Sequence, residues 1–153
     1  MALNKALESV TENDLQELLG KVPEEKTIEY KLALPGNSES QRKEFLADVS
    51  SFANAAGGDL IYGIRAAAGV PTEVCGLQEI DLDAKKLELE NVIRDGIRPR
   101  IPGVGIRGVP LTSGVVIIIR IPKSWASPHM VIFGKHDRFY SRNSAGKFRL
   151  DVD

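Results

Sequence analysis

The chain has 153 residues and a net charge of −1, with 42% hydrophobic and 27% charged residues, which are ordinary proportions for one soluble globular domain. Its longest apolar run, Val115 to Ile119, is far too short for a membrane span, and the amino terminus lacks the hydrophobic core of a secretory signal. A single cysteine, Cys75, excludes an internal disulfide and a cysteine-based zinc cage, so a reducing cytoplasm is the expected compartment.

The first third of the chain predicts a short helix, a strand and a longer helix. Thr11 can cap a helix that ends at Gly20. Residues 27–33 alternate as a strand does, with Ile28, Tyr30 and Leu32 on one face. Ser38 and Gln41 fit a capping box for a central helix over about 39–56, whose apolar face is made of Phe45, Val49, Phe52, Ala53 and Ala56.

A two-glycine corner follows the central helix. Gly57 stands where a helix ends in the left-handed conformation, and residues 59–65 form the strand behind it. Gly63 inside this strand indicates close approach by another part of the chain. Residues 66–71 are expected to form a loop and residues 73–77 a brief strand.

The second half predicts one more helix and then strands. Asp81 or Asp83 can cap a helix that runs to about Gly96, with an apolar side of Leu87, Val92 and Ile93 and with Leu89 less in phase. Residues 104–111 and 115–121 read as a β-hairpin whose second arm is apolar on both faces, which is typical of a central strand. Short strands are expected over 129–133 and 138–143, and a last segment from 147. The order predicts a single α+β domain, a mixed β-sheet with two to three helices, cut from the amino-terminal end of a longer protein.

Charge is distributed unevenly along the chain. Residues 1–90 hold 9 Lys and Arg against 17 Asp and Glu, whereas residues 91–153 hold 11 against 4. Such asymmetry indicates an anionic partner or two halves that face each other. Arginine binds phosphate in a forked geometry, so the candidate nucleic-acid contacts are Arg98, Arg100, Arg107, Lys123, Lys135, Arg138, Arg142, Asn143, Lys147 and Arg149. Arg142 has a second interpretation, as a structural residue that ties down the last strand.

A second constellation is acidic. Glu29 and Lys31 lie on one face of the first strand, with Glu24 close before them, and such an E-x-K pattern holds Mg²⁺ in many metal-dependent nucleases. The alternative is a charge pair between strands. His129 and His136 have no partners that predict a metal site, and no phosphate-binding loop occurs.

Three segments in order resemble one family, namely Ile28 to Lys31, Phe52 to Ile64 and Phe139 to Ser144. They are similar to signatures of the Schlafen/AlbA-type DNA-binding domain, and the resemblance covers about residues 10–153. It implies an α+β fold related to the archaeal chromatin protein Alba. It also implies a role as the amino-terminal nucleic-acid-binding module of a larger regulator or helicase-like protein.

The same resemblance bears on catalysis and assembly. Some animal Schlafens cleave RNA with two glutamates and an aspartate, and the two glutamates would fall at Glu24 and Glu29. The place of the third acid reads Arg65-Ala66-Ala67, so cleavage would need Asp59 or Glu73 instead. Binding to DNA or RNA, without a cofactor, is therefore the expected function. An RNase that uses Mg²⁺ or Mn²⁺ and a dimerisation domain are the alternatives, and a homodimer is expected because Alba-like folds commonly pair.

Overall fold

The computed structural model describes residues 3–135 and 137–150, which form three α-helices, two short 3-10 helices and ten strands. The helices are α1 (Glu12–Gln16), α2 (Glu39–Ala53) and α3 (Leu82–Gly96), and the 3-10 helices are η1 (Leu7–Ser9) and η2 (Phe133–Lys135). The strands are β1 (Ile28–Lys31), β2 (Gly58–Tyr62), β3 (Ile64–Ala67), β4 (Val70–Val74), β5 (Ile97–Arg98), β6 (Gly105–Pro110), β7 (Val115–Ile121), β8 (Met130–Val131), β9 (Arg138–Asn143) and β10 (Gly146–Leu150). This is the predicted α+β class.

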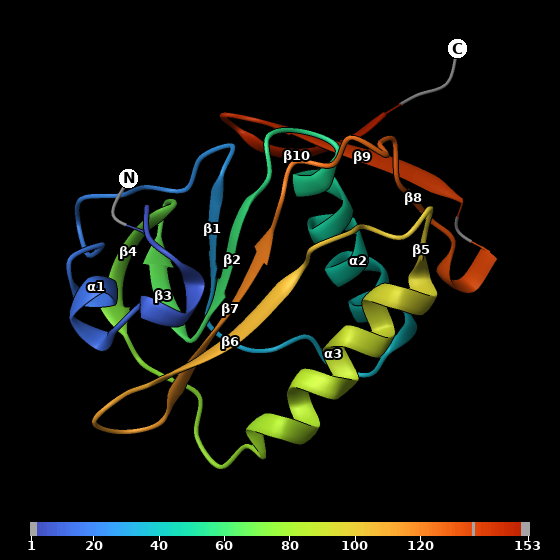
Figure 1. The fold of residues 1–153 in the computed structure, drawn as a ribbon. Coiled ribbons are helices and arrows are strands. Elements are labelled where there is room, and N and C mark those ends of the chain that lie inside the picture. Colours follow the sequence, from blue (N-terminus) through green and yellow to red (C-terminus); the bar gives the residue numbers. More distant parts are fainter. Residues whose placement is uncertain (1–2, 136, 151–153) are drawn as a thin grey trace.

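The strands form two four-stranded sheets and a separate hairpin, where the sequence predicted one sheet. The central sheet has the order β1-β2-β7-β6 and is mixed, because β1 runs parallel to β2 and the other pairs are antiparallel. The second sheet has the order β10-β9-β8-β5, and β3 pairs with β4 alone. Figure 1 shows α2 between the two sheets, while α1 and the β3–β4 hairpin lie on the other side of the central sheet.

The central sheet is covered on both faces, which explains the apolar character of β7. Ile117 and Ile119 belong to a core with α2 and α3, whereas Val116 and Ile118 belong to a second core on the opposite face. All four side chains are fully buried. Successive strand residues point to opposite faces, so a strand between two cores must be apolar at every position. The predicted hairpin of β6 and β7 is confirmed, and its second arm, β7, lies inside the sheet between β2 and β6.

The second core is closed by the first residues of the chain. Leu3, Leu7 and Val10 are buried, as are Leu15 and Leu18 around α1. Two arginines of the sheet hold this segment through its backbone. Arg107 donates to the carbonyl of Val10 at 3.0 Å, and Arg120 donates to the carbonyls of Lys5 and Leu3 at 2.6 and 3.0 Å.

Helix α2 begins as its sequence predicts and ends three residues before the predicted end at 56. Ser38 accepts from the N–H of Gln41 at 3.1 Å, and Gln41 accepts in return, which completes the capping box. The helix ends at Ala53, before Gly57, which has a left-handed φ of 75°. A Cβ on Gly57 would lie 2.5 Å from the backbone nitrogen of Lys123. The glycine therefore lets the chain after β7 pack directly against the end of α2.

Several local predictions were wrong. The expected loop over 66–71 is part of the β3–β4 hairpin, whose two-residue turn uses positive φ at Ala68 and Gly69. On α3, Leu89 is buried and Leu87 is 58% exposed, the reverse of the predicted phase. Leu32 and Ala56 are also exposed, because β1 ends at Lys31 and α2 ends at Ala53.

Gly63 separates β2 from β3 with a φ of 107°. Its Cβ position lies 3.3 Å from both Gly76 Cα and Val116 Cγ2, so the predicted close approach is confirmed. Among the described residues, no helix combines the length and the apolar character that crossing a bilayer requires.

Candidate functional site

The predicted nucleic-acid contacts divide into four groups in the structure. Arg98, Arg100 and Lys123 are exposed on two adjoining segments, whereas Arg107 is half-buried against the amino-terminal segment. Arg142 and Lys147 belong to a buried charge network. The remaining four residues, Lys135, Arg138, Asn143 and Arg149, are exposed around η2, β9 and β10.

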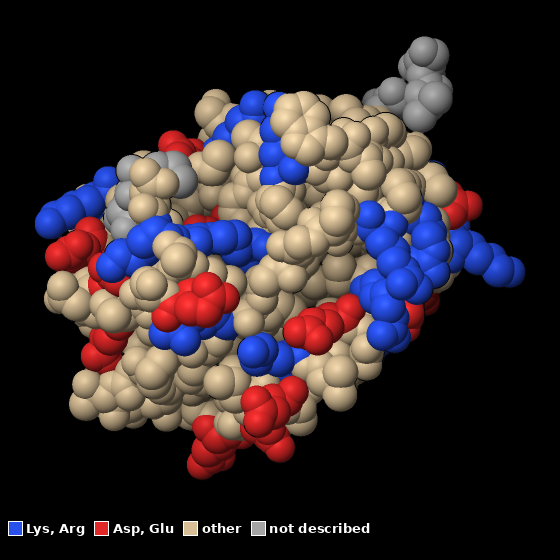
Figure 2. Space-filling model, viewed as in Figure 1, with Lys and Arg blue, Asp and Glu red and all other residues tan. Residues whose placement is uncertain are grey.

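The carboxyl end of α3 and β5 carry a group of arginines. Arg98 donates to the backbone carbonyls of Arg94 and Ile97 at 2.6 and 3.0 Å. The hydrogen bond from Arg94, at 3.1 Å, lowers the pKa of Asp95, and the positive charges of Arg94, Arg98 and Arg100 act in the same direction. All three arginines therefore lie close together, and Figure 2 shows Lys and Arg side chains gathered over β5 and the adjoining end of α3.

The segment after β7 runs beside these arginines. His129 is fully buried, and its Nδ1 lies 2.6 Å from the carbonyl oxygen of Pro99, the residue between Arg98 and Arg100. A Cβ on Gly103 would lie 3.4 Å from the Pro122 side chain, so residues 98–103 follow residues 122–129 for some distance. In Figure 1 both segments cross the same end of the molecule. We call the exposed side chains of Arg94, Arg98, Arg100 and Lys123 the cationic face.

His129 and Asn54 hold residues 122–129 in place through hydrogen bonds on the interior side. A carbonyl oxygen only accepts, so Nδ1 of His129 donates to Pro99, and in the neutral ring Nε2 accepts from the Ser124 hydroxyl at 2.6 Å. Asn54, just after α2, accepts from the N–H of His129 at 2.7 Å and donates to the carbonyls of His129 and Tyr140 at 3.0 and 2.8 Å. The amide of Asn54 thus joins α2 to the segments on either side of β8.

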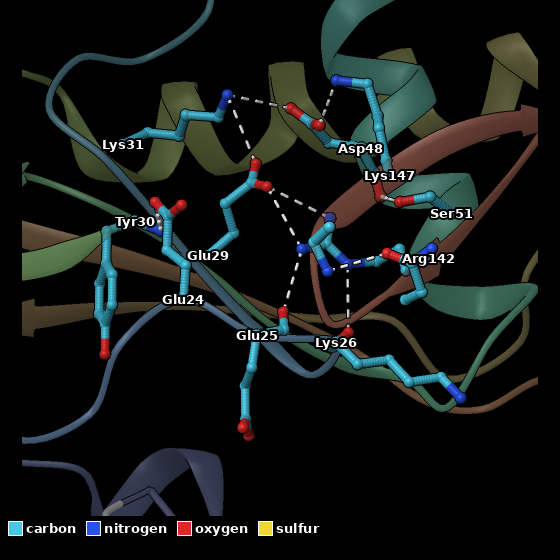
Figure 3. A network of polar contacts seen from close by, with 12 residues as sticks. Glu24, Glu25, Lys26, Glu29, Tyr30, Lys31, Asp48, Ser51, Arg142 and Lys147 are labelled. Atoms are coloured by element: carbon cyan, nitrogen blue, oxygen red, sulfur yellow. Dashed lines mark hydrogen bonds and ion pairs between the residues drawn. The ribbon is translucent and has the colours of Figure 1, made fainter. Parts of the chain in front are cut away.

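The E-x-K pair of β1 lies in the charge network shown in Figure 3. Glu29 Oε2 lies 3.4 Å from Lys31 Nζ, and Glu29 Oε1 accepts from Arg142 at 3.3 Å. Asp48 of α2 joins the network, 3.6 Å from Lys31 and 2.7 Å from Lys147. Lys147 also pairs with Glu44. The network connects β1, α2, β9 and β10 and explains why Asp48 of α2 is buried, whereas Glu44 meets Lys147 at the surface.

Arg142 is an interior residue. Its side chain is 1% exposed, and its guanidinium donates to the carbonyls of Lys26 and Glu25 at 3.1 and 3.2 Å as well as to Glu29. Its guanidinium carbon lies 4.0 Å from the centre of the Phe52 ring, a cation–π contact. This geometry matches the second interpretation of Arg142, a residue that ties down the last strands, and it removes Arg142 from the exposed basic surface.

The network shifts the titration of its members. Burial acts to lower the pKa of Lys147, but the carboxylates of Asp48 and Glu44 more than offset this, so the pKa is raised. Burial also acts to lower the pKa of Lys31, and Asp48 and Glu29 raise it overall. The pKa of Tyr62 is raised strongly by burial and further by the charges of Asp48 and Glu29. These groups therefore hold their protons more tightly in the folded protein.

The glutamates of the nuclease hypothesis line one cavity. Glu24, Glu25 and Glu29 border a volume of about 310 Å³, together with the Ala68–Gly69 turn and Arg142. Gly69 accepts a hydrogen bond from the N–H of Glu24 at 2.7 Å, so the segment without the third acid does lie beside Glu24.

The orientation of these carboxylates does not assemble a metal site. Glu24 accepts from the N–H of Tyr30 at 3.3 Å, the side chain of Glu25 points away from the network in Figure 3, and Glu29 faces two cations. Asp59 is bound by Arg120 at 2.8 and 3.1 Å, and Glu73 lies 3.6 Å from Arg65 on the hairpin. Across the described residues, no three His, Cys, Asp or Glu side chains gather as metal ligands would. His136 lies outside the described residues.

Sequence reasoning missed Trp125, the one tryptophan of the chain. Its side chain is 90% exposed, and the ammonium of Lys123 lies 5.1 Å from the centre of its ring. The spacing Lys-x-Trp in a segment between two prolines was the available signal.

Comparison with known proteins gives a family and a fold. A family model described as "Schlafen, AlbA_2" matches residues 24–151. Among solved structures, the amino-terminal domain of a RecG-related protein from Nitrosomonas europaea aligns with a TM-score of 0.57 at 19% identity, covering 94% of this chain and 95% of that domain. The DIP2311 protein from Corynebacterium diphtheriae aligns with a TM-score of 0.57 at 20% identity over 82% of this chain, which spans 22% of that protein. No curated protein matches significantly.

Proposed function

The chain belongs to the Schlafen, AlbA_2 family, and on this premise we propose that it is a nucleic-acid-binding module that contacts phosphates through its cationic face. The description of the Nitrosomonas relative, an ATP-dependent DNA helicase RecG-related protein, supports a role alongside nucleic acid. Such a module would serve a larger regulator or helicase-like protein.

The cationic face is the observation that carries the proposal. Four basic side chains, Arg94, Arg98, Arg100 and Lys123, come from two segments that are held together through His129. The carbonyls that Arg98 binds orient its guanidinium but do not neutralise it. Because Arg98 is oriented by these backbone contacts and remains exposed, it can bind a phosphate with little further loss of conformational freedom.

Salt dependence tests this proposal. Affinity for fluorescently labelled DNA and RNA oligonucleotides would be measured by anisotropy between about 50 and 200 mM salt, because each phosphate contact releases counterions and steepens the salt dependence. The double variant Arg98→Ala/Arg100→Ala should weaken binding about equally for all sequences and reduce the salt slope by roughly 2 units.

A matched variant controls for charge alone. Lys21 and Arg65 are exposed and belong to the acidic half of the chain, beside the β3–β4 hairpin. Lys21→Ala/Arg65→Ala removes the same two charges and should change affinity less than 3-fold, roughly the scale of one weak surface contact. Equal losses in both double variants, or affinity independent of salt, would refute the cationic face.

A metal-dependent RNase is the second candidate, favoured by the three glutamates around one cavity. Incubation of the protein with tRNA and Mg²⁺ or Mn²⁺ would reveal it. Glu24 is the informative position, because its carboxylate lies outside the Lys31 and Arg142 pairs that make Glu29 structural. Cleavage that persists in Glu24→Gln would rule out this site.

A homodimer is a further part of the proposal. Strand β10 forms an edge of its sheet, and Phe148 and Leu150 on it are 42% and 38% exposed. An open edge with apolar side chains favours pairing with a second copy. Light scattering should give a dimer mass that Phe148→Asp reduces to that of the monomer, and a monomer at high concentration would refute this part.

A further inference from the structure

Trp125 is far more exposed than a tryptophan usually is. Tryptophan is on average among the more buried residues, because its ring is large and apolar. Here 90% of the side chain is accessible, while the next residue on its amino-terminal side, Ser124, is 4% exposed. The indole is therefore presented outward from a segment whose neighbouring residue faces the interior.

The segment that presents the indole is ordered by hydrogen bonds on both sides of it. The N–H of Ser124 donates to the carbonyl of Ala53 at 3.2 Å, and the Ser124 hydroxyl accepts from the N–H of Ala126 at 3.1 Å. His129 holds Ser124 from beneath at 2.6 Å. A ligand that contacts the ring therefore does not have to order this segment, and binding loses little to conformational entropy.

One cation lies against the ring, and the segment that carries two more is joined to it through His129. The ammonium of Lys123 lies 5.1 Å from the ring centre, within the range of a cation–π contact. Arg98 and Arg100 flank Pro99, whose carbonyl binds the same His129 that holds the Trp125 segment. An exposed aromatic ring beside cations is the arrangement with which proteins bind a nucleic-acid strand, since the ring stacks on a base and the cations bind its phosphates.

Resting on the proposed function, we propose that Trp125 stacks on an unpaired base and makes single-stranded nucleic acid the preferred ligand of the cationic face. In a duplex both faces of each base are covered by neighbouring bases, so the indole gains a stacking partner only where a base is unpaired or at a strand end. Phosphates are common to single strands and duplexes, so the cationic side chains bind both. The Trp125 ring accounts for the preference for single strands over duplexes.

Trp125 is the one tryptophan of the chain, so the intrinsic tryptophan fluorescence of the protein measures contacts of this ring directly. Intrinsic fluorescence would be titrated with a single-stranded oligonucleotide of about 12 residues, with a strand of the same length whose sugars carry no bases, and with the matching duplex. Stacking predicts strong quenching by the intact strand and weak quenching by the other two. Equal quenching by all three, or none while anisotropy shows binding, would overturn the inference and leave the proposed function standing.

Substitution gives an independent measurement by anisotropy. Trp125→Ala should weaken single-strand binding between about 5-fold and 150-fold, the range found for loss of one base–aromatic stack, and change duplex binding less than 3-fold. Trp125→Phe keeps a ring and should restore most of the affinity. Because the side chain is exposed, the thermal midpoint of both variants should match that of the unchanged protein.

The remaining outcomes separate the two proposals. If no strand binds at low salt, both fail. If Trp125→Ala weakens single-strand and duplex binding equally, the preference fails and phosphate binding survives. If Trp125 emission shifts with vesicles of anionic phospholipid and not with oligonucleotides, the ring serves a lipid surface and the inference is wrong.

Discussion

Replacing Arg142 with Met should destabilise the protein by roughly 3–5 kcal/mol, the cost typical of breaking a buried ion pair from one side. The guanidinium makes hydrogen bonds to Glu29, Lys26 and Glu25 at 3.1 to 3.3 Å, and only 1% of the side chain is exposed. Methionine fills much of the space against Phe52 but leaves Glu29, which is 13% exposed, with Lys31 as its one remaining cation in the network. Domains are stable by about 5–15 kcal/mol, so the loss is a large fraction of the total.

Urea unfolding followed by circular dichroism measures this loss. Arg138→Met on the same strand is the control, because Arg138 is exposed and the hydrogen bond that it donates to the Asp137 carbonyl is long, at 3.5 Å. A change within about 0.5 kcal/mol is therefore expected. Adding Glu29→Gln to Arg142→Met should recover part of the stability, with a coupling energy of roughly 0.5–3 kcal/mol. A loss below about 1 kcal/mol, or no coupling, would refute the assignment of Arg142 to the interior network.

Three other predictions rest on contacts described above at Gly57, Asn54 and Tyr62. Gly57→Ala should destabilise the protein by at least about 2 kcal/mol, because the residue has a left-handed φ and its Cβ would lie 2.5 Å from the backbone nitrogen of Lys123. Gly20→Ala is the control: Gly20 has a similar φ of 70° but open space around it, so only the backbone strain of about 1–2 kcal/mol is expected. Equal losses of stability in thermal unfolding would contradict the close approach at Gly57. Asn54→Ala removes three hydrogen bonds around β8 and should cost about 1–3 kcal/mol, with faster amide exchange at His129 as the local sign. Stability should fall above about pH 10, because the unfolded chain loses protons from Tyr and Lys near their ordinary pKa values of 10.0 and 10.5 while the folded protein keeps them. Tyr62→Phe should flatten that decline in urea midpoints, and an unchanged pH slope would show that Tyr62 does not titrate as inferred.

The sequence predicted best what local rules determine. The capping box of Ser38 and Gln41 requires only residues three apart, and the left-handed conformation at Gly57 requires only a helix end. The apolar run in β7 indicated a central strand because alternate side chains must be buried on both faces. These features depend on neighbours along the chain, so periodicity and composition reveal them.

Features that depend on distant partners could not be predicted in this way. Arg142 and Glu29 are 113 residues apart in sequence, and nothing near either residue shows that the guanidinium is buried. Basic residues are mostly exposed, so the sequence placed Arg142 with the surface cations. The β3–β4 hairpin was missed for a more local reason. Residue 68 of its two-residue turn adopts a φ of 51°, which alanine seldom takes, so the sequence indicated a loop and not a tight turn.

The amino-terminal layer has a practical consequence for producing the protein. The family match begins at residue 24, yet Leu3, Leu7, Val10, Leu15 and Leu18 cover one face of the central sheet. A fragment trimmed to the matched range would leave Ile61 and Ile118 open to water and would leave Arg107 and Arg120 without the carbonyls that they bind. Residues 3–18 should therefore be kept in any recombinant version. The family match shows which residues relatives share, whereas the packing shows which residues cover the core and keep it from water.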